Sequence, residues 1–116
     1  MTFPKLGEIW LVCFDPSVGT EYIKTRPALI LSNDVNNEVN KRVTLLPITG
    51  DPGRPISFTV LLIPDAVNNL HKPSIVRPID ITTFDKSRLI KKIGDIDNKS
   101  LTIVREIVIQ HLNLTL

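Results

Sequence analysis

Short aliphatic runs separated by turn-forming residues are the feature that most constrains how this 116-residue chain can fold. Runs of Ile, Leu and Val this short, bounded by Gly, Pro, Asn or Asp, are typical of β-strands. We expect strands at residues 8–14, 27–32, 43–48, 58–63, 74–84 and 89–93, with one helical turn at 85–88. Pro78 has no backbone N–H, so it must occupy a bulge or a sheet edge within the fifth run. Many short strands joined by turn-rich connections predict a small β-barrel in a mainly β (α+β) fold.

The C-terminal segment has a different pattern. Apolar residues recur at helical spacing at Leu101, Val104, Val108 and Leu112, with Ile103, Ile107 and Ile109 widening the apolar face. Asp97 is a suitable N-cap, so we expect a helix over about residues 98–112. The apolar face is wider than one core contact needs. It packs either on the domain core alone or on the core and a second subunit.

Length and composition indicate a single domain over residues 1–116. Hydrophobic residues make up 42% of the chain and charged residues 22%, which are ordinary values for a globular protein. Aromatic residues make up only 5%, so the core must consist mainly of Ile, Leu and Val. A net charge of +2 permits a nucleic-acid partner without requiring one.

Neither a disulfide framework nor a metal site is expected. Cys13 is the only cysteine and lies in an apolar run, where a buried small side chain is favoured over a reactive thiol. The acids are scattered and the only two histidines, His71 and His111, are far apart in sequence, so we expect no metal and no cofactor. No signal segment or run of ~20 apolar residues is present, and a soluble, cytoplasmic protein is expected.

The loop before the second strand carries the strongest functional signal. It places Glu21 and Arg26 close together in sequence, and Pro27 keeps Arg26 extended where the strand begins. A guanidinium fixed on a rigid strand is a planar set of donors that matches a phosphate. Two interpretations are open from these residues alone: a phosphate-binding site, or a surface ion pair between the two side chains.

Several short motifs follow one another along nearly the whole chain. They are residues 7–12 and 14–16, residues 18–21 with Thr25-Arg26-Pro27-Ala28, then residues 32–34, 46–49, 85–89 and 92–94, followed by the terminal helix. In this order they resemble the PemK/MazF family of toxin endoribonucleases, the mRNA interferases. The resemblance implies a small SH3-like β-barrel of the CcdB/PemK type with a C-terminal α-helix, forming a homodimer.

The same resemblance implies a toxin of a type II toxin-antitoxin system. Such a toxin cleaves single-stranded RNA, usually mRNA, without a metal, and its antitoxin inhibits it through a flexible, acidic C-terminal segment. The family's arginine, threonine and loop glutamate fall on Arg26, Thr49 and Glu21, our candidate catalytic residues. The candidate RNA-binding residues are Thr20, Tyr22, Lys24, Thr25, Arg54, His71, Arg77 and Lys86, with Lys41 and Arg42 as further backbone contacts.

The chemistry of these residues fits cleavage by the 2′-hydroxyl. Arg26 would stabilise negative charge on the phosphate oxygens, and Thr49 would donate a hydrogen bond to the same phosphate. Arg26 is unsuitable as a general base because arginine stays protonated near neutral pH. Glu21 is the better candidate, either as the base or as the group that orients Arg26.

One stretch departs from the family pattern. Where relatives often carry Glu-Gln-Ile-Arg, this chain has Ile79-Asp80-Ile81-Thr82, so the cleavage sequence cannot be transferred. Two rival functions remain: a non-catalytic, CcdB-like toxin that binds gyrase, and an SH3-like binding module. Gyrase-binding toxins carry a tryptophan near the C-terminus, whereas the only tryptophan here is Trp10.

Overall fold

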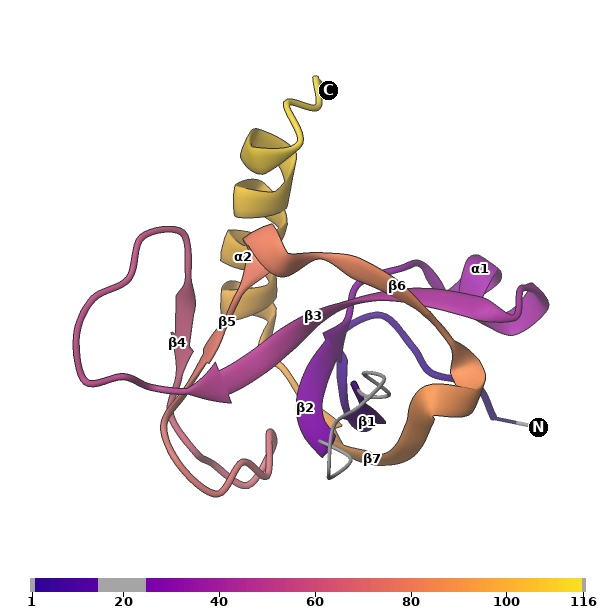
Figure 1. Ribbon diagram of the computed structural model, residues 1–116, viewed down its shortest axis with the longest axis horizontal. Coiled ribbons are helices and arrows are strands. Elements are labelled where there is room, and N and C mark those ends of the chain that lie inside the picture. Colours follow the sequence, from indigo (N-terminus) through magenta and orange to yellow (C-terminus); the bar gives the residue numbers. More distant parts are fainter. Residues whose placement is uncertain (1, 15–24, 116) are drawn as a thin grey trace, which may run out of the picture.

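Antiparallel strands form the body of the molecule (Figure 1). The computed structural model describes residues 2–14 and 25–115. In chain order the elements are β1 (Glu8–Cys13), β2 (Thr25–Ile30), α1 (Asp34–Val39), β3 (Arg42–Gly50), β4 (Val60–Leu62), β5 (Ser74–Val76), η1 (Pro78–Asp80), β6 (Thr82–Asp85), η2 (Lys86–Arg88), β7 (Leu89–Asp95) and α2 (Asn98–His111). The predicted mainly β (α+β) fold with a C-terminal α-helix is confirmed, and its strands pair antiparallel.

The long strand β3 connects the two parts of the sheet. Its first residues, up to Leu45, pair with β6. Its middle pairs with β2, and the pairing ends where Ala28 lies opposite Pro47. Its last residues pair with β5, where Thr49 lies opposite Ile75. The main path of the sheet therefore has the order β4-β5-β3-β2-β1-β7, with β6 attached to β3.

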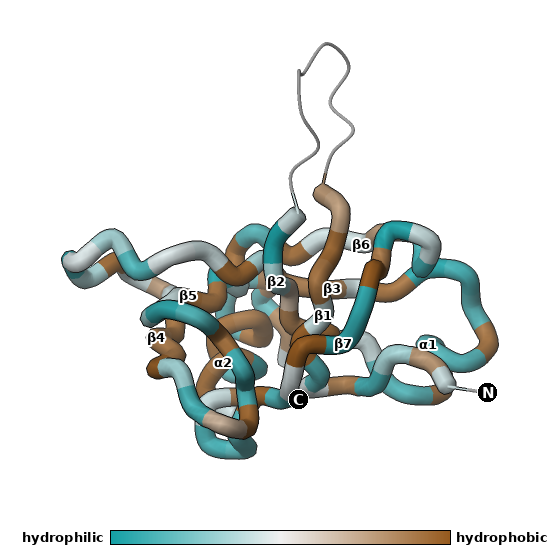
Figure 2. Tube along the Cα trace, turned by 90° about the horizontal axis from the view of Figure 1, so that it is seen from below, coloured by the Kyte–Doolittle hydropathy of each residue, from teal (hydrophilic) through white to brown (hydrophobic). Residues whose placement is uncertain are grey.

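Two hydrophobic clusters occupy opposite faces of β1, β2 and β3. The first joins Ile9, Leu29 and Leu46 to apolar residues of β4, β5 and α2. The second consists of Val12, Ala28, Ile30, Val43 and Leu45. Successive residues of a strand face opposite sides, so these central strands are buried on both faces. Figure 2 shows β1 and β3 as largely hydrophobic, whereas α2 alternates between hydrophobic and hydrophilic residues. Both clusters are built from Ile, Leu, Val and Ala, as the composition predicts.

Hydrogen bonds around Glu8 fix the start of β1. Glu8 Oε1 accepts a hydrogen bond from the Lys5 N–H at 2.9 Å and another from Trp10 Nε1 at 2.9 Å. Glu8 Oε2 forms an ion pair with Lys92 Nζ of β7 at 3.2 Å. Gly7, at φ +88°, precedes it and donates its N–H to the Ile30 carbonyl at 2.9 Å. The motif at residues 7–12 therefore has a structural role: it joins β1 to β2 and β7.

The terminal helix has the predicted bounds and cap. Asp97 is the N-cap, and its carboxylate accepts a hydrogen bond from the Ser100 N–H at 2.8 Å. Val104 and Val108 are buried in the first cluster, whereas Ile103 is 41% exposed. The polar, asparagine-rich segment 33–42 contains α1, a helix of six residues.

The predicted strands at 8–14, 27–32, 43–48 and 58–63 differ from the observed strands by up to two residues at their ends, and two further predictions differ for reasons that the structure shows. The run 74–84 is broken into β5 and β6 by the 3₁₀ turn η1, which begins at Pro78, because proline cannot donate to the ladder. The run 89–93 continues through Gly94 to Asp95. Position 94 requires glycine, because the carbonyl oxygens of Val67 and Asn68 approach it too closely for any side chain.

Cys13 is partly exposed, so the expectation of a buried side chain is wrong. It is the last residue of β1 and lies opposite Thr25 at the exposed start of β2. None of the helices in the described ranges is both long and apolar enough to cross a membrane.

Candidate active site

The strands β2 and β3 stop pairing just before the two residues expected to act on the phosphate. Their last pair is Ala28 with Pro47. Arg26 lies two residues before Ala28 on β2, and Thr49 lies two residues after Pro47 on β3. Continuing this antiparallel register brings Arg26 and Thr49 to the same level, at the point where β3 has turned to pair with β5 (Figure 1).

Arg26 and Thr49 also belong to the same face of the sheet. Residues two apart on a strand share a face, so Arg26 shares the face of Ala28, and Thr49 shares the face of Pro47. Cross-strand partners share a face as well. Val12 lies opposite Arg26 on β1, and both Val12 and Ala28 belong to the second hydrophobic cluster. By strand alternation and the continued register, the two candidate catalytic residues belong to one face of the sheet.

Arg26 is exposed and positioned by β-structure. Pro27, the residue after it, lies opposite Leu11 in the ladder between β1 and β2. Among the described residues, no carboxylate forms an ion pair with Arg26. Its guanidinium is permanently charged and presents donors in one plane. Such a group can bind two oxygens of a phosphate.

Four predicted site residues lie outside the described residues: Glu21, Thr20, Tyr22 and Lys24. Their roles stay predictions, and so does the expected pairing of Glu21 with Arg26. Thr25, the first described residue after them, is exposed at the start of β2.

Arg77 lies beside the end of β3. Its backbone N–H donates to the Pro47 carbonyl at 3.1 Å, which places it next to the last pair of β2 and β3. Its Nε donates to the Asp80 carboxylate at 2.7 Å. Asp80 belongs to the stretch that departs from the family pattern. The charge of Arg77 is thus partly balanced within this chain, which weakens its attraction for RNA.

Arg54 and His71 are exposed in the connections before β4 and before β5. The Asp51 N–H donates to the Pro73 carbonyl at 3.0 Å, which joins these two connections near the end of β3. Sequence reasoning missed Lys72 here. Its Cε and Nζ lie 3.1 Å from the position that a Cβ on Gly50 would take. Two sequence features could have indicated Lys72 as a site residue: its position next to His71, and the glycine after Thr49 that leaves space for its side chain.

Lys86 lies away from this group. Its backbone N–H donates to the Lys41 carbonyl at 2.8 Å, and its Nζ donates to the Glu38 carbonyl at 3.4 Å. It is therefore near the start of β3. Arg42 and Thr49 are separated by ~23 Å along the strand, at ~3.3 Å per residue. The structure thus divides the predicted RNA contacts between the two ends of β3.

The arrangement around Arg26 and Thr49 supplies a fixed positive charge and a hydroxyl donor. These groups suit the binding of a phosphodiester and the stabilisation of added negative charge on it. No cluster of three or more His, Cys, Asp or Glu side chains that could hold a metal ion occurs within residues 2–14 and 25–115.

Comparison with known proteins identifies the family. Residues 5–112 match the family described as PemK-like, MazF-like toxin of type II toxin-antitoxin system. The chain is 31% identical over 115 residues to endoribonuclease MazF9 of Mycobacterium tuberculosis, covering 95% of this chain and 97% of the relative. It is 29% identical over 104 residues to endoribonuclease MazF of Staphylococcus saprophyticus, covering 90% and 87%.

The fold is shared with solved structures of this group. The chain superimposes on MazF in a MazE-MazF structure from Deinococcus radiodurans with a TM-score of 0.82, at 24% identity and with 97% of each chain covered. The motif order, the fold and the family match over residues 5–112 agree. The chain belongs to the family of PemK-like, MazF-like toxins of type II toxin-antitoxin systems.

Proposed function

We propose that this toxin endoribonuclease cleaves single-stranded mRNA at short sequences, without a metal ion. The 2′-hydroxyl loses its proton and attacks the adjacent phosphorus, the bond to the 5′-oxygen breaks, and that oxygen takes a proton from water, so the products carry a 2′,3′-cyclic phosphate and a 5′-hydroxyl. The activity named for the relatives at 31% and 29% identity supports RNA as the substrate.

One observation carries the proposal. Continuing the register of β2 and β3 two residues beyond the pair of Ala28 and Pro47 puts Arg26 and Thr49 at the same level and on the same face of the sheet. A phosphate between them would meet a guanidinium from β2 and a hydroxyl from β3. Both residues belong to strands, so their backbone does not have to be ordered when the RNA binds.

Three chemical tasks are assigned to this chain. Arg26 binds the non-bridging phosphate oxygens and stabilises the charge that they gain in the transition state. Thr49 donates a hydrogen bond to the same phosphate. Glu21 removes the 2′ proton or orients Arg26, because a carboxylate is ionised at neutral pH and can accept a proton.

The biological setting follows from the family. We propose that the toxin acts on mRNA in the cytoplasm as a homodimer. Its cognate antitoxin inhibits it through a flexible, acidic C-terminal segment that competes with RNA for the cationic surface around Arg26. Family membership as a toxin of a type II system supports this partner.

The test is incubation of the purified protein with end-labelled single-stranded RNAs in excess EDTA. We expect fragments that end in a 2′,3′-cyclic phosphate, identified by mass spectrometry. Intact RNA over a panel that contains all short sequences would contradict the proposal. Binding of gyrase without RNA cleavage would support the CcdB-like rival, which the match to PemK-like, MazF-like toxins disfavours.

Variants at the site test the assigned roles. Arg26→Ala should lower kcat/KM by at least ~100-fold, or ~2.7 kcal/mol of barrier, because an oxyanion contact is lost. Glu21→Gln keeps the size of the side chain and removes the base. Thr49→Val keeps the shape and removes the hydroxyl, and a fall of only two- to threefold, under ~1 kcal/mol, would assign Thr49 to structure. Urea unfolding of each variant controls for loss of fold.

A further inference from the structure

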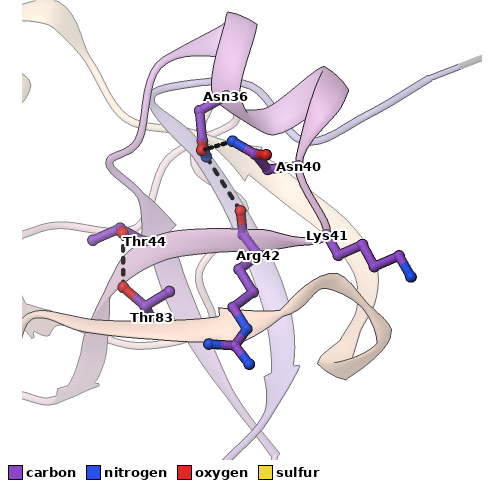
Figure 3. A pocket seen from close by; sticks show the side chains of 6 residues that line it. All are labelled: Asn36, Asn40, Lys41, Arg42, Thr44 and Thr83. Atoms are coloured by element: carbon purple, nitrogen blue, oxygen red, sulfur yellow. Dashed lines mark hydrogen bonds between the residues drawn. The ribbon is translucent and has the colours of Figure 1, made fainter.

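A polar pocket lies at the end of β3 opposite to the site of Arg26 and Thr49 (Figure 3). It has a volume of about 330 Å³ and is lined by Asn36, Asn40, Lys41, Arg42, Thr44 and Thr83. These residues come from three places: α1, the start of β3, and β6. We call this group the α1–β3 pocket.

Neutral groups of the α1–β3 pocket are held in place by local hydrogen bonds. Asn36 Nδ2 donates to the Arg42 carbonyl at 3.2 Å, and Asn40 Nδ2 donates to Asn36 Oδ1 at 2.7 Å. The hydroxyls of Thr44 and Thr83 lie 2.9 Å apart across the two strands. Side-chain amides and hydroxyls both donate and accept hydrogen bonds. The pocket wall is therefore pre-organised and offers acceptors as well as donors.

Two cations flank these neutral groups. Figure 3 shows the Arg42 guanidinium across β6 and the Lys41 side chain extending outward from the same end of β3. Both residues are exposed, and within the described part of the chain neither forms an ion pair. Asp85 lies opposite Arg42 in the ladder. The pKa of Asp85 is lowered first by the Ser87 backbone hydrogen bond and further by Arg42 and Lys41.

Lys86 adds a third cation at this corner of the molecule. Its backbone N–H bonds to the Lys41 carbonyl, and its ammonium group lies 3.4 Å from the carbonyl of Glu38 in α1. Positive charge with adjacent amides and hydroxyls is the composition that binds a sugar-phosphate group.

We infer that the α1–β3 pocket binds one nucleotide of the substrate RNA, several nucleotides away from the cleaved bond. The inference rests on the proposed function, because it assumes that Arg26 and Thr49 hold the scissile phosphate. Lys41 and Arg42 contact the phosphate, while Asn40, Thr44 and Thr83 face the sugar or base.

Size and chemistry favour a nucleotide over a segment of the acidic antitoxin. The volume of about 330 Å³ is near the lower limit of small-molecule sites, ~300–1,000 Å³, and suits one nucleotide. Carboxylates require donors only, whereas a nucleotide also presents donors, on its ribose and base edges. The acceptors among the pocket's amides and hydroxyls match a nucleotide.

The distance between the two sites leads to a test by RNA length. The ~23 Å between Arg42 and Thr49 along β3 means that a fragment of a few nucleotides around the cut cannot reach both. A longer RNA can. Substitutions in the pocket should therefore slow cleavage of the long RNA and leave cleavage of the short RNA unchanged.

The test variant is Lys41→Gln/Arg42→Gln. Its control is Lys91→Gln/Lys99→Gln, which removes the same charge from exposed positions on β7 and α2. We expect the test variant to lower kcat/KM by about tenfold for a long RNA that the wild type cuts, and the control to lower it by less than about twofold. For the same RNA trimmed to a few nucleotides around the cut, both variants should match the wild type.

Binding gives a readout that is independent of cleavage. In an Arg26→Ala background, fluorescence anisotropy with the long RNA should show weaker binding for the Lys41→Gln/Arg42→Gln variant. The slope of log K against log salt should fall by ~0.7, since Lys41 and Arg42 contact one phosphate and each phosphate contact on a single strand contributes ~0.7.

Several results would overturn the inference. The first is an equal loss of kcat/KM in the test and control variants, and the second is an equal loss for the long and the trimmed RNA. The third is normal binding of RNA with weakened binding of a synthetic Asp/Glu-rich peptide, which would assign the pocket to the antitoxin. If no RNA is cleaved by the wild type in EDTA, the proposed function fails. The anisotropy result with long RNA then still decides whether the α1–β3 pocket binds RNA.

Discussion

At the scale of single residues, Glu8 illustrates how a charged side chain in a family motif serves the fold. Burial alone would raise the pKa of Glu8, but hydrogen bonds from Trp10, the Lys5 N–H and Lys92 outweigh it and hold the pKa below its ordinary value. Lys92 has a raised pKa, chiefly because of its bond to Glu8. The ionised carboxylate is therefore part of the contact between β1 and β7.

The contribution of Glu8 to stability should depend on pH. A lowered folded pKa means that the stabilisation is fully present above the ordinary value of 4.5 and is lost as the pH falls through the lower folded value. The difference in free energy of unfolding between the wild type and Glu8→Gln should be largest near neutral pH and shrink below about pH 4.5. Urea unfolding at several pH values measures this, with the exposed Glu38→Gln as control. A difference that does not change with pH would contradict the prediction.

Residues whose role depends on their sequence neighbours were predictable. Pro27 fixes Arg26 as extended, and Asp97 caps a helix whose apolar spacing follows it. The ion pair of Arg77 with Asp80 was not predicted, because it depends on the 3₁₀ turn that Pro78 begins. The turn geometry, rather than the residue types, brings the two charges together.

At the scale of secondary-structure elements, β7 depends on Gly94. A Cβ at this position would lie 2.5 Å from the carbonyl oxygens of Val67 and Asn68. The same connection is bonded to the strand, since the Asp95 N–H donates to the Val67 carbonyl at 3.0 Å. Backbone carbonyls cannot rotate away as a flexible side chain can. β7 can therefore lie against Val67 and Asn68 only with a glycine at position 94.

Gly94→Ala should lower the free energy of unfolding by about 3 kcal/mol, because the connection must move away from β7. The matched control is Gly50→Ala, whose new Cβ would meet only the flexible end of Lys72. Its effect should stay below about 1 kcal/mol. Urea denaturation compares the two, and similar losses would contradict the close approach as the cause.

The N-cap of α2 gives a second prediction for an element. Asp97→Ala removes the acceptor for the Ser100 N–H and should lower the free energy of unfolding by about 1 kcal/mol. Asp97→Ser, which retains a capping oxygen, should recover most of this loss. If alanine and serine at this position are equally stable, the hydrogen bond is not what stabilises the start of the helix.

Element types were easier to predict than element bounds. The periodicity of residues 98–112 identified α2, and the aliphatic runs identified the strands. The break between β5 and β6 and the passage of β7 through Gly94 were missed. Pro78 marked an irregularity but not that it begins a 3₁₀ turn, and the passage of β7 through Gly94 depends on the distant connection at residues 63–73.

At the scale of the whole molecule, the two hydrophobic clusters share β1, β2 and β3. The first cluster is covered by α2, and the second has Trp10 packed against it. If these strands separate, both clusters lose their packing, because each cluster is built on one face of the same three strands. The molecule should therefore unfold as one unit.

Two probes can follow the two clusters separately. Fluorescence of Trp10, the only tryptophan, reports on the second cluster, and the helical signal in far-UV circular dichroism comes mainly from α2, which packs in the first. We expect both signals to change with the same midpoint in urea. Separate midpoints would mean that the clusters unfold independently.

The sequence motifs predicted the family, but not how its residues are distributed in space. The register of β2 and β3, continued past Ala28 and Pro47, relates Arg26 to Thr49, and no local pattern reveals that register. Lys86 is placed beside Lys41 because β6 pairs with the start of β3. Long-range strand pairing therefore decides which of the predicted residues can act together.

A single uninterrupted strand carries Arg42 at its start and Thr49 near its end. It acts as a rigid spacer whose length is set by its number of residues. Adding two residues within β3 would move the ends apart by ~7 Å and keep every side chain on its original face, whereas adding one would turn Thr49 to the other face. The length of β3 thus sets the length of RNA that can reach both ends of the strand.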